Sequence, residues 1–278
     1  MKKQTGNLFA LLDYEAVKII NLTQGISGDI RAVFLKYGEE LLNDRKEQIL
    51  FNGNYVVEDD EILFVKMPLA PTVSSATANA VGTPELNLNT DKIKALFWYE
   101  NGVYYFQNFD NRRLLASRNV IFYREGTYSR LTDNAFIIEN TVSAVYSEDQ
   151  LYFTSYANAN KLFSLSAFYH AATNEEIETF ADSNKVNLDT DWFTNKTNST
   201  IRKQITLLLK SKVLDSIDPE AIRYAAKDFK LDIEVDDGKI VFPNNAKKSK
   251  DILVFLNEQY YTGLITGTRY RTNSKRKA

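Results

Sequence analysis

Few residues in this chain of 278 residues could carry catalysis. It contains one histidine, His170, and no cysteine, so thiol nucleophiles, disulfides and thiolate metal sites are excluded. A Ser–His–Asp triad could be built only around His170, and no G-x-S-x-G motif is present. The histidine ends an apolar stretch, AFYHAAT, so we interpret it as a packing or capping residue near a helix C-terminus.

An acidic group near a predicted hairpin turn is the second candidate for chemistry. Glu234, Asp236 and Asp237, followed by Lys239, have the residue types that hold magnesium in metal-dependent nucleases. They lie in LDIEVDDGKIVF, where Asp237-Gly238 has the sequence of a tight turn. We favour the turn and keep the nuclease as an alternative. With no Walker loop and no G-x-G-x-x-G, we predict no catalytic residue, metal site or cofactor.

The positive charges are better organised than the acids. Because the formal net charge is −2, any nucleic-acid binding must come from a local patch. One basic group ends the chain, where Asp251 and Glu258 are the only acids after residue 246, and a looser group lies between residues 112 and 130. Converging Lys and Arg side chains are what DNA phosphates require. A solvated, solubilising tail is the other interpretation.

We predict the following DNA-binding residues in the terminal group: Lys247, Lys248, Lys250, Arg269, Arg271, Lys275, Arg276 and Lys277. From the looser group, which also includes Arg118 and Arg124, we predict Arg112, Arg113 and Arg130.

Residues 200–242 are expected to form a helix, a turn, a helix and a β-hairpin, which is the element order of a winged helix. Asp218-Pro219 has the sequence of a helix start, with an N-cap followed by proline in the first turn. Arg223, Lys227 and Lys230 share the polar face of the second helix. Nearby acids dilute this charge, so sequence-specific reading of DNA is not predicted.

Three regions are predicted along the chain: an N-terminal α+β region over 1–70, a linker or loop rich in Ser, Thr, Ala and Pro over 71–90, and an α+β domain over 91–278. In the first region, apolar residues at helical spacing over 30–42 predict a helix and EILFVKM predicts a strand. The small, polar residues of PTVSSATANAVGTP are typical of a flexible linker.

A β-meander is predicted over 95–155, where six short runs rich in Val, Ile, Phe and Tyr are separated by turn signals such as Asn101-Gly102. The runs are 95–99, 103–109, 119–124, 135–139, 142–147 and 151–155. Successive hairpins favour an antiparallel sheet, whose apolar face helices must cover. The fold class is therefore α+β.

The segment 158–278 is predicted to be largely helical. Leu162, Leu165, Tyr169 and Ala172 share one face of a predicted helix, and Thr173 begins a T-x-x-E capping box for the next. A short helix follows the lysine cluster at 247–250, and a strand is expected over 260–270.

Two parts of the chain resemble the KwaB-like family of the Kiwa anti-phage system. They are LYFTSYANANKLFSLSAFYHAATNEEIETF and ILVFLNEQYYTGLITGTRYRTNSKRK, and the resemblance covers roughly 95–278. The matching residues are Lys161, Leu162, Phe163, Leu165, Ala172, Thr173, Glu175, Glu176, Ile177, Leu256, Asn257, Tyr260, Tyr261, Thr266, Gly267, Ser274, Lys275 and Arg276.

This resemblance implies a non-enzymatic DNA-binding protein of bacterial phage defence, a homodimer or higher homo-oligomer that acts with a small transmembrane partner. The expected location is the cytoplasm, with recruitment to the inner face of the cell membrane by that partner. The N-terminal LFALL imitates a signal peptide, but Asp13 and Glu15 interrupt it. Two alternatives remain: a non-enzymatic oligomeric interaction module without nucleic-acid binding, and a metal-dependent nuclease.

Overall fold

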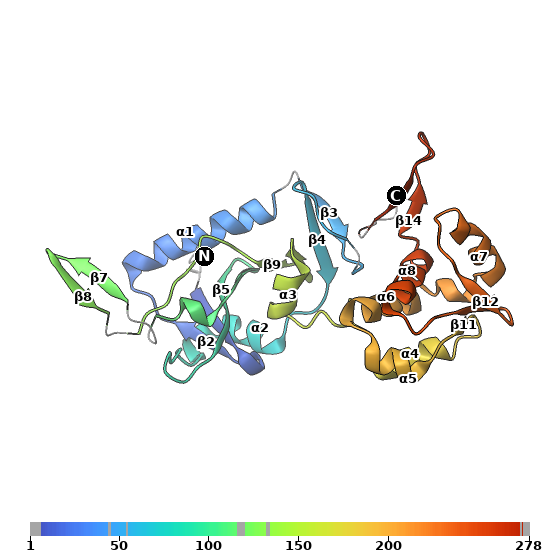
Figure 1. Cartoon of the computed structure of the whole chain (residues 1–278). Coiled ribbons are helices and arrows are strands. Elements are labelled where there is room, and N and C mark those ends of the chain that lie inside the picture. Colours follow the sequence, from blue (N-terminus) through green and yellow to red (C-terminus); the bar gives the residue numbers. More distant parts are fainter. Residues whose placement is uncertain are drawn as a thin grey trace. The chain divides into compact units, whose positions relative to one another are not determined.

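The protein is described by a computed structural model that covers residues 7–43, 46–53, 55–115, 120–131, 134–272 and 274, without the side chains of Phe122 and Arg124. The fold is α+β, as predicted (Figure 1). The chain divides into two compact units. Unit 1 comprises Met1–Phe51 and Val57–Ser164, and unit 2 comprises Asn52–Val56 and Leu165–Ala278.

Unit 1 is built on an eight-stranded sheet with the order β2-β1-β5-β6-β9-β10-β4-β3. Its pairs are antiparallel except β3–β4, which is parallel. The strands are β1 (Asn7–Leu12), β2 (Val17–Ile20), β3 (Glu47–Leu50), β4 (Glu61–Lys66), β5 (Ile93–Glu100), β6 (Val103–Asn108), β9 (Ala144–Ser147) and β10 (Gln150–Phe153).

The predicted meander forms the centre of this sheet, as β5-β6-β9-β10. The N-terminal strands complete it, because β1 pairs with β5 and β4 pairs with β10. Pairing satisfies the backbone groups that each edge of a four-stranded meander would expose. The structure therefore groups the described residues of 7–51 and 57–70 with the meander in unit 1, and it assigns Asn52–Val56 to unit 2.

One predicted strand of the meander is absent from the described residues. Residues 135–139 form only an isolated bridge, between Leu114 and Phe136. In the chain between Leu114 and Phe136 lies a separate hairpin, in which β7 (Ile121–Arg124) pairs with β8 (Thr127–Arg130). The predicted turn at Asp133-Asn134 begins outside the described residues.

Helices cover both faces of the sheet of unit 1. On one face α1 (Gln24–Leu41) buries Phe34, Gly38 and Leu41. On the other, α2 (Pro71–Ala78) and α3 (Tyr156–Leu162) pack against the central strands, where Thr77 Oγ1 lies 3.1 Å from the Tyr104 hydroxyl oxygen. The ring of Phe163, just after α3, contacts Phe106 edge-on with 4.9 Å between centroids.

The segment predicted to be a linker is thus a packed helix. In α2 the proline stands in the first turn, where no backbone N–H is needed, and Val73, Ala76 and Thr77 are buried. Small side chains let the helix approach the sheet closely, and the same small side chains give the sequence the composition of a flexible loop.

Unit 2 contains five helices among its described residues: α4 (Asn174–Ala181), α5 (Thr190–Lys196), α6 (Ser199–Ser211), α7 (Pro219–Lys227) and α8 (Ala246–Leu256). Its strands are β11 (Val186–Asn187), β12 (Glu234–Asp236), β13 (Lys239–Val241), β14 (Tyr260–Thr262) and β15 (Arg269–Arg271). Short 3-10 segments among the described residues of the two units are η1 (Asp13–Glu15), η2 (Ala80–Gly82), η3 (Asn111–Arg113) and η4 (Val213–Asp215).

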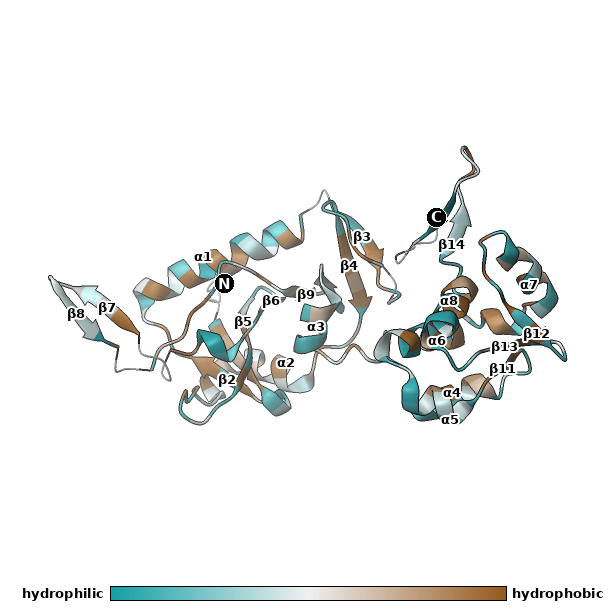
Figure 2. Ribbon diagram, viewed as in Figure 1, coloured by the Kyte–Doolittle hydropathy of each residue, from teal (hydrophilic) through white to brown (hydrophobic). Residues whose placement is uncertain are grey.

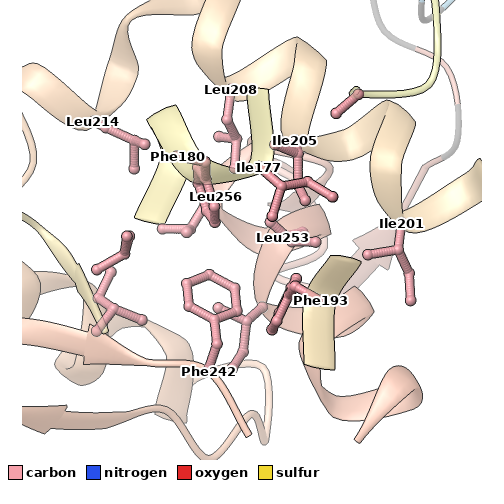
Figure 3. Packing of buried hydrophobic residues seen from close by; sticks show 14 of the residues in the cluster. Ile177, Phe180, Phe193, Ile201, Ile205, Leu208, Leu214, Phe242, Leu253 and Leu256 are labelled. Carbon is pink, nitrogen blue, oxygen red and sulfur yellow. The ribbon is translucent and has the colours of Figure 1, made fainter. Parts of the chain in front are cut away.

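The core of unit 2 brings all five helices onto the β11-β13-β12 sheet. Phe180, Phe193 and Phe242 point toward one another in it (Figure 3), with centroid separations of 5.6 Å and 5.8 Å from Phe242 to the other two. Ile205 of α6 and Leu253 of α8 are fully buried beside them. This core fixes the positions of α7 and α8, which support the β14–β15 hairpin at the end of unit 2.

Several helix starts in unit 2 follow the sequence signals. The Thr173–Glu176 capping box is formed, and Asp218 caps α7 with Pro219 in its first turn. The helix, turn, helix and hairpin predicted for 200–242 are present as α6, η4, α7 and β12–β13. Asp237 and Gly238 have φ of 47° and 71°, which confirms the predicted tight turn.

Two predictions for the second half of the chain are wrong. The helix expected through Leu162–Ala172 stops at Phe163, whose backbone is extended, because the apolar residues at helical spacing belong to the cores of two different units. The strand expected over 260–270 is instead the hairpin β14–β15, since Gly263 and Gly267 allow the chain to turn.

Candidate nucleic-acid interface

Two ion pairs fasten the β14–β15 hairpin to the helices of unit 2. The Arg269 guanidinium lies 3.5 Å from Asp228, the residue that caps the end of α7. The Arg271 guanidinium donates a hydrogen bond of 3.0 Å to Asp251 of α8. The hairpin therefore stands at the place where the end of α7 and the N-terminal half of α8 meet.

An aromatic layer supports these arginines from below. Phe229, Phe255 and Tyr260 contact one another with centroid separations of 5.5–5.9 Å. The guanidinium of Arg269 lies 5.9 Å from the Phe229 ring and that of Arg271 lies 5.4 Å from the Tyr260 ring, which adds cation–π attraction. Burial raises the pKa of Tyr260, although the nearby Arg271 opposes that rise.

Basic side chains from three elements surround the base of the hairpin. Lys247 stands four residues before Asp251, so both lie on one face of α8. Lys230 lines a groove of about 220 Å³ with Arg269 and Arg271. Arg223 and Lys227 of α7 line a separate groove with Asp232 and Glu234. We call the basic side chains on α7, just after it, on α8 and on β15 the basic face of unit 2, and they are Arg223, Lys227, Lys230, Lys247, Lys248, Lys250, Arg269 and Arg271.

Most of the charge on the basic face is open to solvent. Lys227, Lys230, Lys247 and Lys248 are exposed, and within the described part of the chain no ion pair involves these four side chains. Five acids reduce this charge: three pair with arginines, as Glu220 does with Arg223 at 2.5 Å, and Asp232 and Glu234 line a groove with Arg223 and Lys227. The basic face therefore keeps an excess of positive charge.

The other predicted DNA-binding residues are placed differently. Lys275, Arg276 and Lys277 lie outside the described residues, as does Arg118. Arg112, Arg113 and Arg130 belong to unit 1, and Arg130 is exposed on β8. Within unit 2, ion pairs hold Arg269 and Arg271 to the end of α7 and to α8.

Arg112 and Arg113 already have acidic partners in unit 1. Arg112 pairs with Asp110 at 2.9 Å, and its hydrogen bonds lower the pKa of Asp110 to about 2. Arg113 is only 13% exposed and contacts Glu139, Gln107 and the carbonyl of Asn108. It ties residues 107–108 to 139, so its Nη1 and Nη2 donors are used inside unit 1.

His170 is a packing and capping residue, but it lies before the N-terminus of α4 and not near a helix C-terminus as predicted. Its Nδ1 lies 2.7 Å from the carbonyl oxygen of Ser166, and its Nε2 lies 2.8 Å from Glu176. Partial burial opposes ionisation of Glu176, but hydrogen bonds from the Thr173 N–H and from His170 outweigh it and leave the pKa of Glu176 lowered. The histidine thus completes the capping box of α4.

The acidic group on β12–β13 does not converge. Glu234 and Asp236 are exposed on β12, and Asp237 occupies the turn. Among the described residues, no three His, Asp or Glu side chains stand close enough to hold one metal ion. No helix of the described residues has the length and apolar character needed to cross a membrane.

Sequence reasoning missed the exposed residues that accompany the basic face. Tyr224 of α7 is 77% exposed, and it stands four residues before Asp228 on the same helix face. Leu264 and Ile265 occupy the hairpin tip. The flanking glycines in T-G-L-I-T-G are the signal that could have indicated this turn.

The fold and the interface define a class: an α+β protein whose C-terminal unit presents a braced, basic hairpin surface. A family model described as Kiwa protein KwaB-like matches residues 91–266, which is more than half of the chain. The chain therefore belongs to the KwaB-like family and is a component of Kiwa anti-phage defence. No curated protein and no solved structure matches it.

Proposed function

We propose that this component of phage defence binds duplex DNA through the basic face of unit 2, mainly by contacts to phosphates. The observation that carries the proposal is that two ion pairs hold β15 to the end of α7 and to α8, so that the elements which carry the eight side chains of the basic face are fixed to one another. Five of them remain after subtraction of the three acids with which arginines pair, Glu220, Asp228 and Asp251.

The proposal makes a quantitative statement about salt. Each neutralised phosphate contributes about 0.9 to the slope of log K against log salt concentration for duplex DNA. Five contacts therefore give a slope of about −4.5. Arginine and lysine contacts to the backbone fix position without reading bases, so affinity should vary little between unrelated duplexes of one length.

Fluorescence anisotropy with a labelled 30-base-pair duplex, between 50 and 300 mM salt, tests the proposal. Charge reversal of Lys227→Glu with Lys247→Glu should weaken binding and lower the salt slope by about 2. The matched control is Lys196→Glu with Lys212→Glu, which changes two exposed lysines of unit 2 outside the basic face. Equal affinities for the two double variants would contradict the proposal.

Family membership supports the rest of the proposal. The protein acts as a homodimer or higher homo-oligomer, without an enzymatic step, together with a small transmembrane partner that recruits it to the inner face of the cell membrane. Co-purification of a membrane protein encoded beside it tests the transmembrane partner. Multi-angle light scattering of the purified protein tests the homo-oligomer.

A non-enzymatic interaction module without DNA binding is the second candidate, and the β7–β8 hairpin favours it. Ile121, Tyr123 and Tyr128 are 58%, 64% and 75% exposed on this hairpin, and a two-stranded hairpin alone is marginally stable in water. If anisotropy shows no DNA binding at 50 mM salt while Tyr128→Ser reduces the oligomer to monomer, this candidate replaces the first.

A further inference from the structure

The tip of the β14–β15 hairpin carries two adjacent aliphatic side chains that contact almost nothing. Leu264 and Ile265 are 103% and 99% exposed, and Figure 2 shows the end of this hairpin as hydrophobic. Burial of side chains of this size is strongly favourable. Two of them side by side at full exposure indicate a partner that covers them.

The tip is a built structure and not a loose loop. The Gly263 N–H donates to the Thr268 carbonyl at 2.8 Å, and the Gly267 N–H donates to the Gly263 carbonyl at 2.8 Å. Gly267 has a φ of +66°, which glycine adopts without strain. Just below the tip, Tyr261 and Tyr270 stack with 5.3 Å between ring centroids, so Leu264 and Ile265 are held outward.

The reach of the tip can be compared with the dimensions of DNA. Arg269 pairs with Thr262 at the end of the hairpin ladder, and Leu264 stands two residues beyond it. Two residues of fully extended chain span at most roughly 7 Å, and residues 264–266 form a turn, so the backbone stops short of the floor of the minor groove, which is about 7.5 Å deep. With the end of the ladder at the phosphates, the side chains of Leu264 and Ile265 cover the remaining distance to the edges of the base pairs.

We propose that Leu264 and Ile265 form a wedge that enters the minor groove of duplex DNA and separates one base step, which bends the duplex. The inference rests on the proposed function and deepens it. Leu and Ile side chains at the end of a positively charged arm are the type that unstack a base step and kink DNA. Lys230, Arg269 and Arg271 line the groove at the base of the arm together with Asp228; the two arginines are paired with Asp228 and Asp251, so Lys230 provides the unpaired complementary charge.

The test measures bending separately from binding. A 30-base-pair duplex labelled at both ends reports bending by fluorescence energy transfer, and 2-aminopurine placed along it reports unstacking. The wild-type protein should bend the duplex by 20–90° and raise the 2-aminopurine fluorescence. Leu264→Ser with Ile265→Ser should abolish both signals and weaken binding less than about tenfold, because the phosphate contacts remain.

Val81→Ser is the matched control, since Val81 is 101% exposed in unit 1 and should leave bending unchanged. Binding without bending by the wild-type protein, or bending that survives the double substitution, overturns the wedge alone. Absence of any binding overturns the proposed function as well. Flotation with phosphatidylserine vesicles tests whether the tip binds a lipid surface instead of DNA. Flotation that depends on Leu264 and Ile265, without DNA bending, assigns the tip to a lipid surface and overturns the wedge.

Discussion

Gly38 is the position where a single methyl group tests how the N-terminal region joins the rest of unit 1. It lies on α1, outside the family match, and faces Tyr105 on β6, inside the match. A Cβ at residue 38 would lie 2.1 Å from Cδ1 and 2.4 Å from Cε1 of Tyr105. Gly38→Ala is therefore expected to force the helix and the sheet apart.

The magnitude follows from two opposing terms. An ordinary Cβ contact is 3.4–4 Å, so the ring of Tyr105, which is only 9% exposed, must move by more than an ångström. Overpacking of this kind costs about 3 kcal/mol at the upper end of the usual range. Alanine returns about 1 kcal/mol as a better helix former than glycine. The net loss of stability should be about 2 kcal/mol.

Gly28 supplies the control within the same helix. A Cβ at Gly28 meets nothing within 4 Å, so Gly28→Ala should stabilise the protein by about 1 kcal/mol. Thermal unfolding followed by circular dichroism should therefore show a Tm lowered by roughly 4–8 °C for Gly38→Ala and raised by roughly 2–4 °C for Gly28→Ala. In a Tyr105→Ala background, Gly38→Ala should no longer destabilise.

The outcome shows whether the N-terminal region and the meander belong to one folded unit. If Gly38→Ala stabilises the protein as much as Gly28→Ala does, α1 does not pack on β6, and residues 1–51 are not part of the unit that holds the meander. If the predicted signs hold, α1 packs against a strand of the family-matched segment 91–266, and the two belong to one folded unit.

Three further predictions address unit 2. Phe242→Ala should cost about 3–5 kcal/mol, measured by urea unfolding, because Phe242 is only 3% exposed among the aromatic rings of the core; a loss below 1 kcal/mol would contradict that packing. The lowered pKa of Glu176 implies stability that is present above its ordinary pKa of 4.5 and is lost as the pH falls through the folded pKa. The difference in unfolding free energy between wild type and Glu176→Gln should therefore narrow on going from pH 6 to pH 3, and a constant difference would show that the hydrogen bonds from Thr173 and His170 do not favour the carboxylate. Arg271→Ala should remove an ion pair and a cation–π contact worth about 1 kcal/mol together, and hydrogen exchange at the β14–β15 amides should become roughly fivefold faster; unchanged exchange would mean that Arg271 does not brace the hairpin.

Features that depend on neighbouring residues could be predicted from the sequence. The capping box at Thr173 forms because its hydrogen bonds join residues only three apart. The turns at Asn101-Gly102 and Asp237-Gly238 form with positive φ at both residues, since Gly and Asn or Asp tolerate that conformation at little cost. Four of the six predicted runs form the meander strands β5, β6, β9 and β10, whereas 119–124 contributes to the separate β7–β8 hairpin and 135–139 makes only an isolated bridge.

The basic face could be predicted only in part. The terminal lysines and arginines were evident in the sequence. The sequence did not show that Arg113 forms an ion pair with Glu139, because the two residues are more than twenty positions apart. Likewise, Leu264 and Ile265 have the composition of a buried strand, and only the hairpin geometry exposes them. Ion pairing and exposure depend on residues distant in the chain.

The sequence alone therefore determined the fold class, the family resemblance, the helix starts, the hairpin turns and the basic character of the C-terminal end. Only the tertiary structure decided that the N-terminal strands complete the meander, that residues 71–78 pack as a helix, and that α7, α8 and β15 share one charged surface. The physical reason is range: local signals act through bonds and contacts within a few residues, whereas strand order, burial and charge pairing are settled by contacts between segments far apart in the chain.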